Sequence, residues 1–148
     1  MMQWGRTEDM DEKELIKHAM DARERSYSPY SQYRVGAALL CGDDTVFTGC
    51  NIENASYPAT VCAERVAVGN AVANGRRDIT AIAIVGGKSG ETGVLTDYAF
   101  PCGICRQVLR EFSDPASFTV IVARSTDDYK KYKLEELLPE SFGPDHLL

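Results

Sequence analysis

The chain has 148 residues, of which 44% are hydrophobic and 26% are charged, and its net charge at pH 7 is −6. This length fits one domain, residues 1–148, with a composition ordinary for a globular protein and a loose tail expected at residues 1–9. The acidic balance argues against nucleic acid as the main ligand, because phosphate binding requires a basic surface. No apolar run approaches the roughly 18 residues of a membrane span, and residues 1–17 lack the apolar stretch of a signal peptide.

The five cysteines are an odd number, which argues against a disulfide framework. Free thiols in a reducing compartment are either small buried side chains or part of the chemistry of the protein. The sequence therefore predicts a cytoplasmic protein without a membrane partner.

The N-terminal half predicts a helix, a hairpin and a second helix. Residues 11–25 carry apolar side chains at helical spacing among charges, and residues 33–50 indicate two strands joined by a Gly-Asp-Asp turn. Residues 62–73 are rich in small side chains and predict a helix. Thr60 stands where its N-cap is expected, and Gly75 stands just after its expected C-terminus.

The C-terminal half completes an α/β pattern. The apolar run 79–85 is typical of a central strand, the segment 86–93 of a flexible loop, and a helix over residues 105–112 is expected directly after Pro101. A buried strand is expected at residues 118–123 and an edge strand at residues 127–134. A short helix at residues 134–138 and a tail at residues 139–148 follow. This order predicts a three-layer α-β-α domain, with helices on the faces of a mixed five-stranded sheet.

Two cysteine motifs lie at the expected starts of two helices. Cys102 and Cys105 have a C-x-x-C spacing, which recurs in zinc sites and in thioredoxin-like redox pairs. A redox pair needs no third cysteine, whereas Cys62 begins the other helix. Two helix N-termini facing one point would stabilise thiolates. The sequence therefore favours Zn²⁺ bound by Cys62, Cys102 and Cys105, with the fourth position open as in a catalytic site.

The alternative is a closed structural site with a fourth protein ligand. Its candidates are the other cysteines and both histidines: Cys41, Cys50, His18 and His146. The cysteines lie at opposite ends of the expected hairpin, where buried thiols are commonly inert, and the histidines lie on a charged helix and in a tail. Glu64 favours the open site, because two residues after a ligand it is well placed to exchange protons with water at the metal.

Residues 62–65, CAER, and residues 101–107, PCGICRQ, together resemble the zinc signature of the cytidine deaminases. The resemblance spans nearly the whole chain, from SPYSQYRVGAAL through GCNIENASYP to ELLPESFGP. In having a cysteine rather than a histidine at position 62, the sequence resembles the short, homotetrameric branch of the family, which acts on free nucleosides. The resemblance implies zinc-dependent hydrolytic deamination of cytidine and deoxycytidine to uridine and deoxyuridine, in pyrimidine salvage.

The resemblance also implies a role for each matching residue. Glu64 would carry protons from water to ring N3 and to the departing ammonia, and Arg65 would offset the charge of the ligand sulfurs. Asn51 and Glu53 would bind ribose hydroxyls, while the backbone amide of Ala63 would bind the base carbonyl.

Three aromatic residues match positions at substrate or subunit contacts. Tyr33 aligns with a phenylalanine of relatives and adds a hydroxyl that needs a partner. Phe142 matches an aromatic side chain that relatives insert into a neighbouring subunit's site, and its alternative role is a core phenylalanine that holds the tail. Tyr57 resembles another interface position.

Three other functions fit parts of the sequence. A blasticidin-S-type deaminase would share the zinc chemistry, but the intact NIEN stretch at residues 51–54 favours a nucleoside. Deamination of cytosine in RNA or DNA is disfavoured by the acidic charge, and a non-catalytic zinc module has no need of Glu64. A carboxylate beside the sugar, without a run of Lys or Arg, favours a free nucleoside over CMP.

Overall fold

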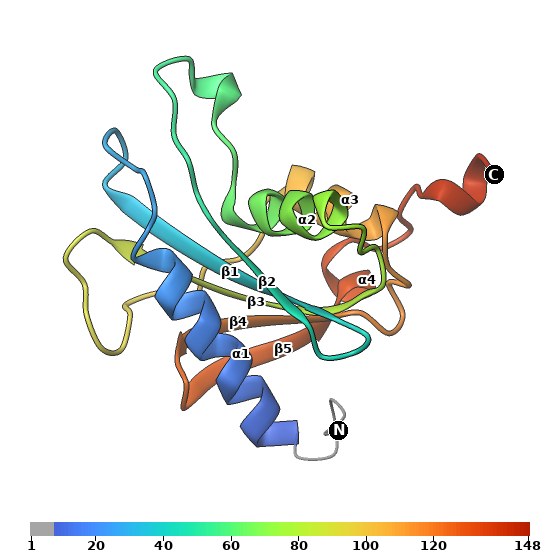
Figure 1. The fold of residues 1–148 in the computed structure, drawn as a ribbon, viewed down its shortest axis with the longest axis horizontal. Coiled ribbons are helices and arrows are strands. Elements are labelled where there is room, and N and C mark those ends of the chain that lie inside the picture. Colours follow the sequence, from blue (N-terminus) through green and yellow to red (C-terminus); the bar gives the residue numbers. More distant parts are fainter. Residues whose placement is uncertain (1–7) are drawn as a thin grey trace.

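A five-stranded sheet lies between two layers of helices in the computed structural model, which describes residues 8–148 (Figure 1). The helices are α1 Glu8–Arg23, α2 Ala63–Ala73, α3 Gly103–Glu111 and α4 Leu134–Leu137, with short 3₁₀ turns at Tyr57–Ala59 and Pro144–His146. The strands are β1 Tyr33–Cys41, β2 Val46–Cys50, β3 Ile79–Lys88, β4 Thr119–Ser125 and β5 Asp128–Lys133. The expected tail lies outside the described residues except at Glu8 and Asp9, which belong to α1. Within the described part, no helix combines the length and apolarity needed to cross a membrane.

The sheet has the strand order β2-β1-β3-β4-β5. Only β3 and β4 run parallel; the other neighbours are antiparallel, so the sheet is mixed as predicted. The predicted hairpin is confirmed by the register of β1 and β2, in which Gly36 lies opposite Cys50 and Leu40 lies opposite Val46.

Both faces of the central strands are buried, because each face carries its own helix layer. Leu39 and Ile82 belong to the core beneath α2 and α3, whereas Leu40 and Ala83 belong to the core beneath α1. Successive side chains of a strand point to opposite faces, so alternate residues serve the two cores. The predicted three-layer α-β-α arrangement is therefore confirmed.

The start of α2 differs from the prediction. Cys62, not Thr60, is the N-cap residue, because Ile52 and Val61 exchange two backbone hydrogen bonds of 2.9 Å and hold the chain extended up to that point. Thr60 instead ends the preceding 3₁₀ turn. Gly75 does follow the helix in the left-handed conformation, with φ of +80°, as predicted.

The segment 86–93 is only partly a loop, contrary to the prediction. Strand β3 continues to Lys88, because β1 supplies a pairing partner as far as Tyr33, which lies opposite Lys88. Gly86 and Gly87 are therefore strand residues.

Helix α2 lies close against the sheet at Gly49 of β2. A Cβ atom at this position would lie 2.4 Å from the carbonyl oxygen of Ala63 and 2.5 Å from the backbone nitrogen of Ala67. Only glycine permits this approach, which fixes the first turn of α2 against the sheet.

Candidate metal centre and substrate cavity

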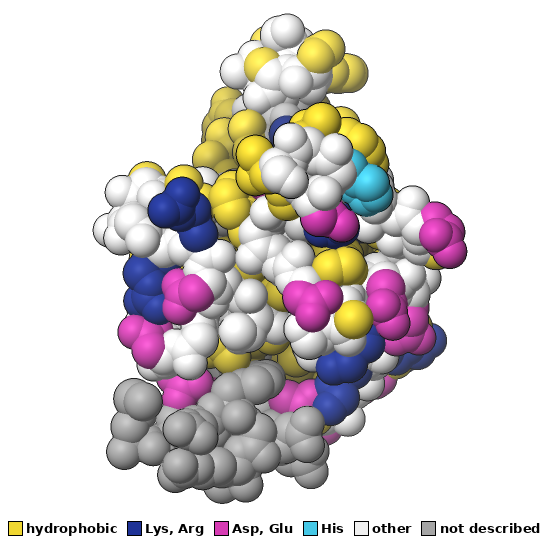
Figure 2. All heavy atoms as spheres, turned by 90° about the vertical axis from the view of Figure 1, so that its right-hand side faces the viewer, with side chains coloured by type: hydrophobic (Ala, Val, Ile, Leu, Met, Phe, Trp, Pro, Cys, Tyr) yellow, Lys and Arg dark blue, Asp and Glu magenta, His cyan; other side chains and the backbone are white. Residues whose placement is uncertain are grey.

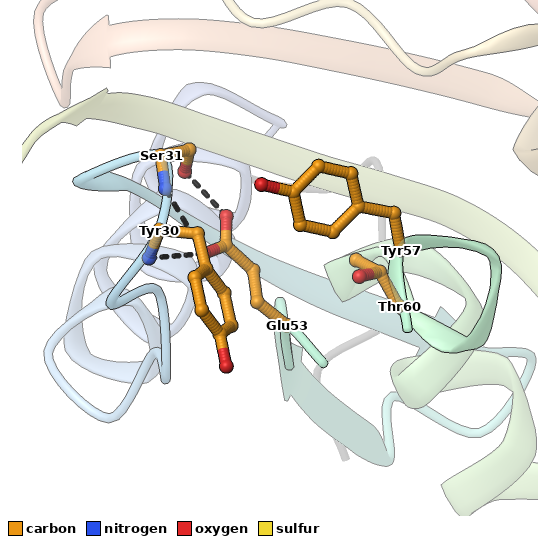
Figure 3. Close-up of a pocket in the computed structure, with 5 residues that line it drawn as sticks. All are labelled: Tyr30, Ser31, Glu53, Tyr57 and Thr60. Atoms are coloured by element: carbon orange, nitrogen blue, oxygen red, sulfur yellow. Dashed lines mark hydrogen bonds between the residues drawn. The ribbon is translucent and has the colours of Figure 1, made fainter. Parts of the chain in front are cut away.

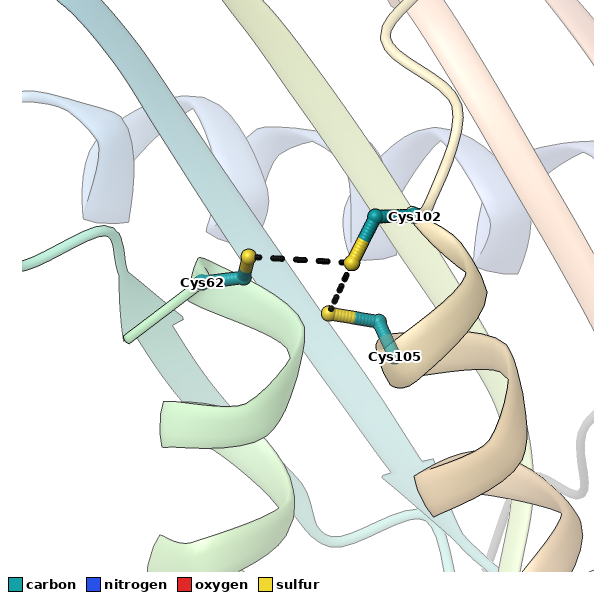
Figure 4. A group of neighbouring side chains, drawn as sticks. All are labelled: Cys62, Cys102 and Cys105. Carbon is teal, nitrogen blue, oxygen red and sulfur yellow. Dashed lines mark hydrogen bonds between the residues drawn. The ribbon is translucent and has the colours of Figure 1, made fainter. Parts of the chain in front are cut away.

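The three predicted cysteines meet at the N-termini of α2 and α3, and we call them the cysteine cluster (Figure 4). Cys62 and Cys102 are the N-cap residues of the two helices, and Cys105 lies in the first turn of α3. The sulfur atoms of Cys62 and Cys102 are 3.9 Å apart, those of Cys102 and Cys105 are 3.4 Å apart, and all three lie within 4.8 Å of one another.

The geometry of the cysteine cluster fits zinc. A tetrahedral ion with Zn–S bonds of about 2.3 Å separates its sulfur ligands by about 3.8 Å, close to both measured distances. Among the residues that the structure describes, the group contains no fourth histidine, cysteine, aspartate or glutamate. The candidates for a closing ligand, Cys41, Cys50, His18 and His146, all lie outside it.

The ionisation of the cysteine cluster calls for a cation. The pKa of Cys62 is lowered to about 5, first by a hydrogen bond from Cys105 and also by one from Arg65, whose Nη2 lies 3.7 Å from the sulfur. The pKa of Cys105 is raised, first because it donates that hydrogen bond and then because it is buried. One thiolate therefore forms easily and the next does not, so three thiolates together need a positive ion.

Arg65 supplies part of that positive charge. Its Nη2 also donates to the Thr60 carbonyl oxygen over 3.4 Å, which holds the guanidinium beside the cluster, and its buried Nε atom has no partner. The arrangement places a positive charge at the sulfurs, and the role of Arg65 in offsetting their charge stays a prediction.

Glu64 is a buried carboxylate next to the cysteine cluster. Only 4% of its surface is exposed, and burial raises the pKa of its carboxyl to about 7, with a further contribution from the Cys62 thiolate. A group with a pKa near neutrality can both accept and donate a proton at physiological pH, as a proton carrier must.

A cavity of about 380 Å³ opens at the cysteine cluster, and we call it the thiol cavity. Its walls include the predicted residues Tyr33, Asn51, Cys62, Ala63, Glu64 and Cys102. They also include residues that the sequence analysis missed: Val35, Thr60, Ile84, Tyr98, Ala99 and Phe100. For Tyr98 and Phe100 a signal was available, because these aromatic residues lie three residues and one residue before Pro101 of the Pro101-Cys102 motif.

Asn51 is held rigidly at the wall of the thiol cavity. Its Oδ1 accepts hydrogen bonds from the backbone nitrogen of Val35, at 2.9 Å, and from the hydroxyl of Ser26. Its Nδ2 donates to the carbonyl oxygen of Tyr33 over 2.9 Å. These contacts use both lone pairs of Oδ1 and one of the two amide hydrogens, so Asn51 retains one donor for a ligand.

Glu53 lies in a neighbouring pocket of about 250 Å³, which we call the tyrosine pocket; it is lined by Tyr30, Ser31, Glu53, Tyr57 and Thr60 (Figure 3). The Glu53 Oε1 atom accepts hydrogen bonds from the backbone nitrogens of Tyr30 and Ser31, and its Oε2 atom accepts one from the Ser31 hydroxyl. These bonds lower the pKa of Glu53, the Ser31 hydroxyl most, and leave Oε2 able to accept one more. Thr60 borders both spaces, so the pocket at Glu53 adjoins the cavity at Asn51.

Phe142 does not line the thiol cavity of its own chain. The residue is 57% exposed, and its ring stacks on that of His146, with the ring centroids 5.2 Å apart. Gln107 donates to the Phe142 carbonyl oxygen, and Arg110 donates to Ser141 and to Asp145, so α3 anchors the tail. Apolar side chains gather over the upper part of the face on which this segment lies (Figure 2).

The chain matches a family model over residues 9–121, described as the cytidine and deoxycytidylate deaminase zinc-binding region. It is 46% identical over 138 residues to a cytidine deaminase of Halalkalibacterium halodurans, covering 93% of this chain and 98% of that one. It is 41% identical over 138 residues to a cytidine deaminase of Sporosarcina psychrophila, covering 93% of this chain and 96% of that one.

Solved structures give the same likeness. A crystal structure of cytidine deaminase from Burkholderia pseudomallei superimposes with a TM-score of 0.77 at 43% identity, covering 87% of this chain and 97% of that one. A crystal structure of cytidine deaminase from Mycobacterium tuberculosis superimposes with a TM-score of 0.71 at 35% identity, covering 88% of this chain and 95% of that one.

Proposed function

This chain belongs to the cytidine and deoxycytidylate deaminase family, and from this premise we propose that it is a cytoplasmic, single-domain enzyme that hydrolyses cytidine and deoxycytidine to uridine and deoxyuridine in pyrimidine salvage. The observation that carries the proposal is a buried Glu64 that lines the thiol cavity together with Cys62 and Cys102 of the cysteine cluster. A structural metal site needs neither the carboxylate nor the cavity.

Cys62, Cys102 and Cys105 would hold one zinc ion per chain. When bound, zinc supplies the Lewis acidity that makes water a nucleophile at neutral pH. Arg65 donates to the Cys62 sulfur and so reduces the negative charge that three thiolates would otherwise build up.

Glu64 moves the protons of the reaction. It takes one proton from the attacking water and passes it to ring N3 as the bond between C4 and oxygen forms. It then carries the second water proton to the amino group as the C4–nitrogen bond breaks, so cytidine and water give uridine and ammonia. A carboxyl with a pKa of about 7 is suited to this double use.

The other walls orient the nucleoside. The amide of Ala63 belongs to the first turn of α2, where backbone N–H groups have no partner within the helix, and it donates to the base carbonyl. Asn51 offers its remaining amide hydrogen to a sugar hydroxyl, and Glu53 offers its remaining lone pair. Tyr33 gives the cavity an apolar ring surface beside the base.

A substrate panel tests this function. We expect cytidine and deoxycytidine to be deaminated, and kcat/KM for CMP to be lower by at least about tenfold, because a phosphate would lie near the Glu53 carboxylate. No lysine or arginine is among the described residues that line either space. The measurement is ultraviolet absorbance for cytidine, deoxycytidine, CMP and blasticidin S on one zinc-loaded preparation; a higher kcat/KM for CMP or blasticidin S would contradict the proposed substrate.

The variant Glu53→Gln is expected to raise KM for cytidine by about tenfold, because the charged acceptor Oε2 becomes an amide NH2 group, which cannot accept a hydrogen bond from a sugar hydroxyl. Glutamine keeps the shape of the side chain and still accepts the two backbone hydrogen bonds at its oxygen. Glu14→Gln is the matched control, since Glu14 is an exposed glutamate on α1, across the sheet from the site. An unchanged KM in Glu53→Gln would remove Glu53 from substrate binding.

We also propose a homotetramer in which Phe142 of one chain completes the cavity of another, with Tyr57 at the same interface. Phe142→Ala is then expected to raise KM by about tenfold or more, as expected for an aromatic residue buried in an interface. Leu147→Ala is the control, because Leu147 is exposed in the same tail. Light scattering of the wild type during turnover is decisive: a fully active monomer would contradict this assembly.

A further inference from the structure

Phe100 is an aromatic wall of the thiol cavity that the proposed mechanism does not use. It lies two residues before Cys102 and lines the cavity together with Cys62, Cys102 and Glu64. Its side chain is large and apolar, yet 44% of the residue remains exposed. Phe100 therefore presents an apolar surface to whatever occupies this part of the cavity.

The position of Phe100 is fixed by its neighbours. Its ring packs edge-on against Tyr132 of β5, with the ring centroids 5.7 Å apart and the planes at 60°. The preceding segment is tied to the same hairpin, because the Tyr98 hydroxyl donates to Asp128 and Lys130 lies 4.5 Å from the Tyr98 ring centroid. Pro101 follows directly and restricts the backbone of Phe100 to extended conformations. The ring is therefore a firm wall.

Phe100 and Glu64 belong to different sides of the cysteine cluster. The start of α2 carries Cys62 and Glu64, whereas the segment leading into α3 carries Phe100 and Cys102, and the two helices face each other across the cluster (Figure 4). In a cytosine ring, N3 and C5 flank C4 on opposite sides. If C4 lies at the cluster and N3 faces Glu64 on the α2 side, then C5 faces the α3 side, where Phe100 stands.

We propose that Phe100 faces C5 of the bound cytosine and excludes nucleosides with a substituent on that carbon. This inference rests on the proposed function, since it needs the amino-bearing carbon at the cysteine cluster. It adds a specificity-determining residue: the enzyme acts on cytosine nucleosides with hydrogen at C5 and discriminates against a methyl group there. One carbon more or less in an apolar pocket changes kcat/KM by roughly 10–200-fold.

The test compares cytidine with 5-methylcytidine in the zinc-loaded wild type and in Phe100→Ala and Phe100→Leu. We expect the wild type to prefer cytidine by at least about tenfold in kcat/KM, and Phe100→Ala to reduce that preference by about tenfold or more. Phe100→Leu keeps an apolar side chain against Tyr132, so its preference for cytidine should lie between that of the wild type and that of Phe100→Ala. The electronic effect of the methyl group is the same in every variant. The change in preference between variants therefore measures only the steric effect of the side chain at position 100.

Ile104→Ala is the matched control. Ile104 lies between two of the cysteines on α3 but is exposed and does not line the thiol cavity, so its removal should leave the preference unchanged. A loss of preference in Ile104→Ala equal to that in Phe100→Ala would show a general loosening of α3 and would overturn the proposal. Equal turnover of both substrates by the wild type would overturn it as well.

Product binding separates this inference from the proposed function. Calorimetry with uridine and 5-methyluridine needs no turnover and should show the same preference, lost in Phe100→Ala. Preferential binding of uridine over 5-methyluridine, without deamination of cytidine, would refute the proposed activity and support the role of Phe100 in specificity. The opposite outcome is deamination of cytidine with a preference for cytidine over 5-methylcytidine that differs by less than about threefold between the wild type and both Phe100 variants. That outcome would support the proposed activity and refute the role of Phe100 in specificity.

Discussion

Replacing Glu64 with glutamine is expected to lower kcat for cytidine by about 10²–10⁴-fold, because an amide cannot carry the protons that the reaction moves. Glutamine has nearly the same shape, and the buried site disfavours the charge of the carboxylate. The raised pKa means that, above neutral pH, the ionised Glu64 costs folding free energy that a neutral amide does not. The fold, the zinc content and the melting temperature at pH 8 should therefore be retained.

Glu12→Gln provides the control for placing an amide at a buried glutamate. Glu12 is also buried, but it lies on α1, on the opposite side of the sheet, and pairs with Lys131 over 3.0 Å. This variant should lose stability while it keeps kcat near that of the wild type. Near wild-type turnover by Glu64→Gln, measured on protein with a full complement of zinc, would remove Glu64 from the mechanism.

Replacing Cys102 with serine is expected to abolish both metal binding and activity. Loss of an outer-shell partner already weakens metal affinity by roughly 10–100-fold, and Cys102 is a direct member of the cysteine cluster, within hydrogen-bonding distance of both other sulfurs. Elemental analysis of the purified protein should give one zinc per wild-type chain and none in the variant. Treatment of the wild type with a chelator should cause the same loss of turnover, restored by added zinc.

Cys50→Ser is the matched control for this loss. Cys50 is a free, half-buried cysteine at the end of β2 and is not a member of the cluster, so its replacement should change neither the zinc content nor kcat. The metal assignment would be refuted by stoichiometric zinc in Cys102→Ser, or by a loss of zinc in Cys50→Ser.

The sequence by itself determined which cysteines would meet, since the three predicted ones form the cluster. Within each motif the spacing is short, two residues from Cys62 to Glu64 and three from Cys102 to Cys105, and such a spacing at a helix start allows few arrangements in space. The layers were predictable as well, because the continuous apolar run 79–85 is typical of a strand buried on both faces, and such a strand requires helices on both sides.

Only the tertiary structure decided where α2 begins, where β3 ends and which residues line the thiol cavity. The residue pair Ile52 and Val61 sets where α2 begins, and the pairing of β1 with β3 turns Gly86 and Gly87 into strand residues; both depend on partners distant in sequence. Phe100 stands directly before Pro101 in the sequence, but it lines the same cavity as Glu64 because the N-termini of α2 and α3 meet. Contacts between distant segments are set by the packing of layers, which no local pattern of the chain encodes.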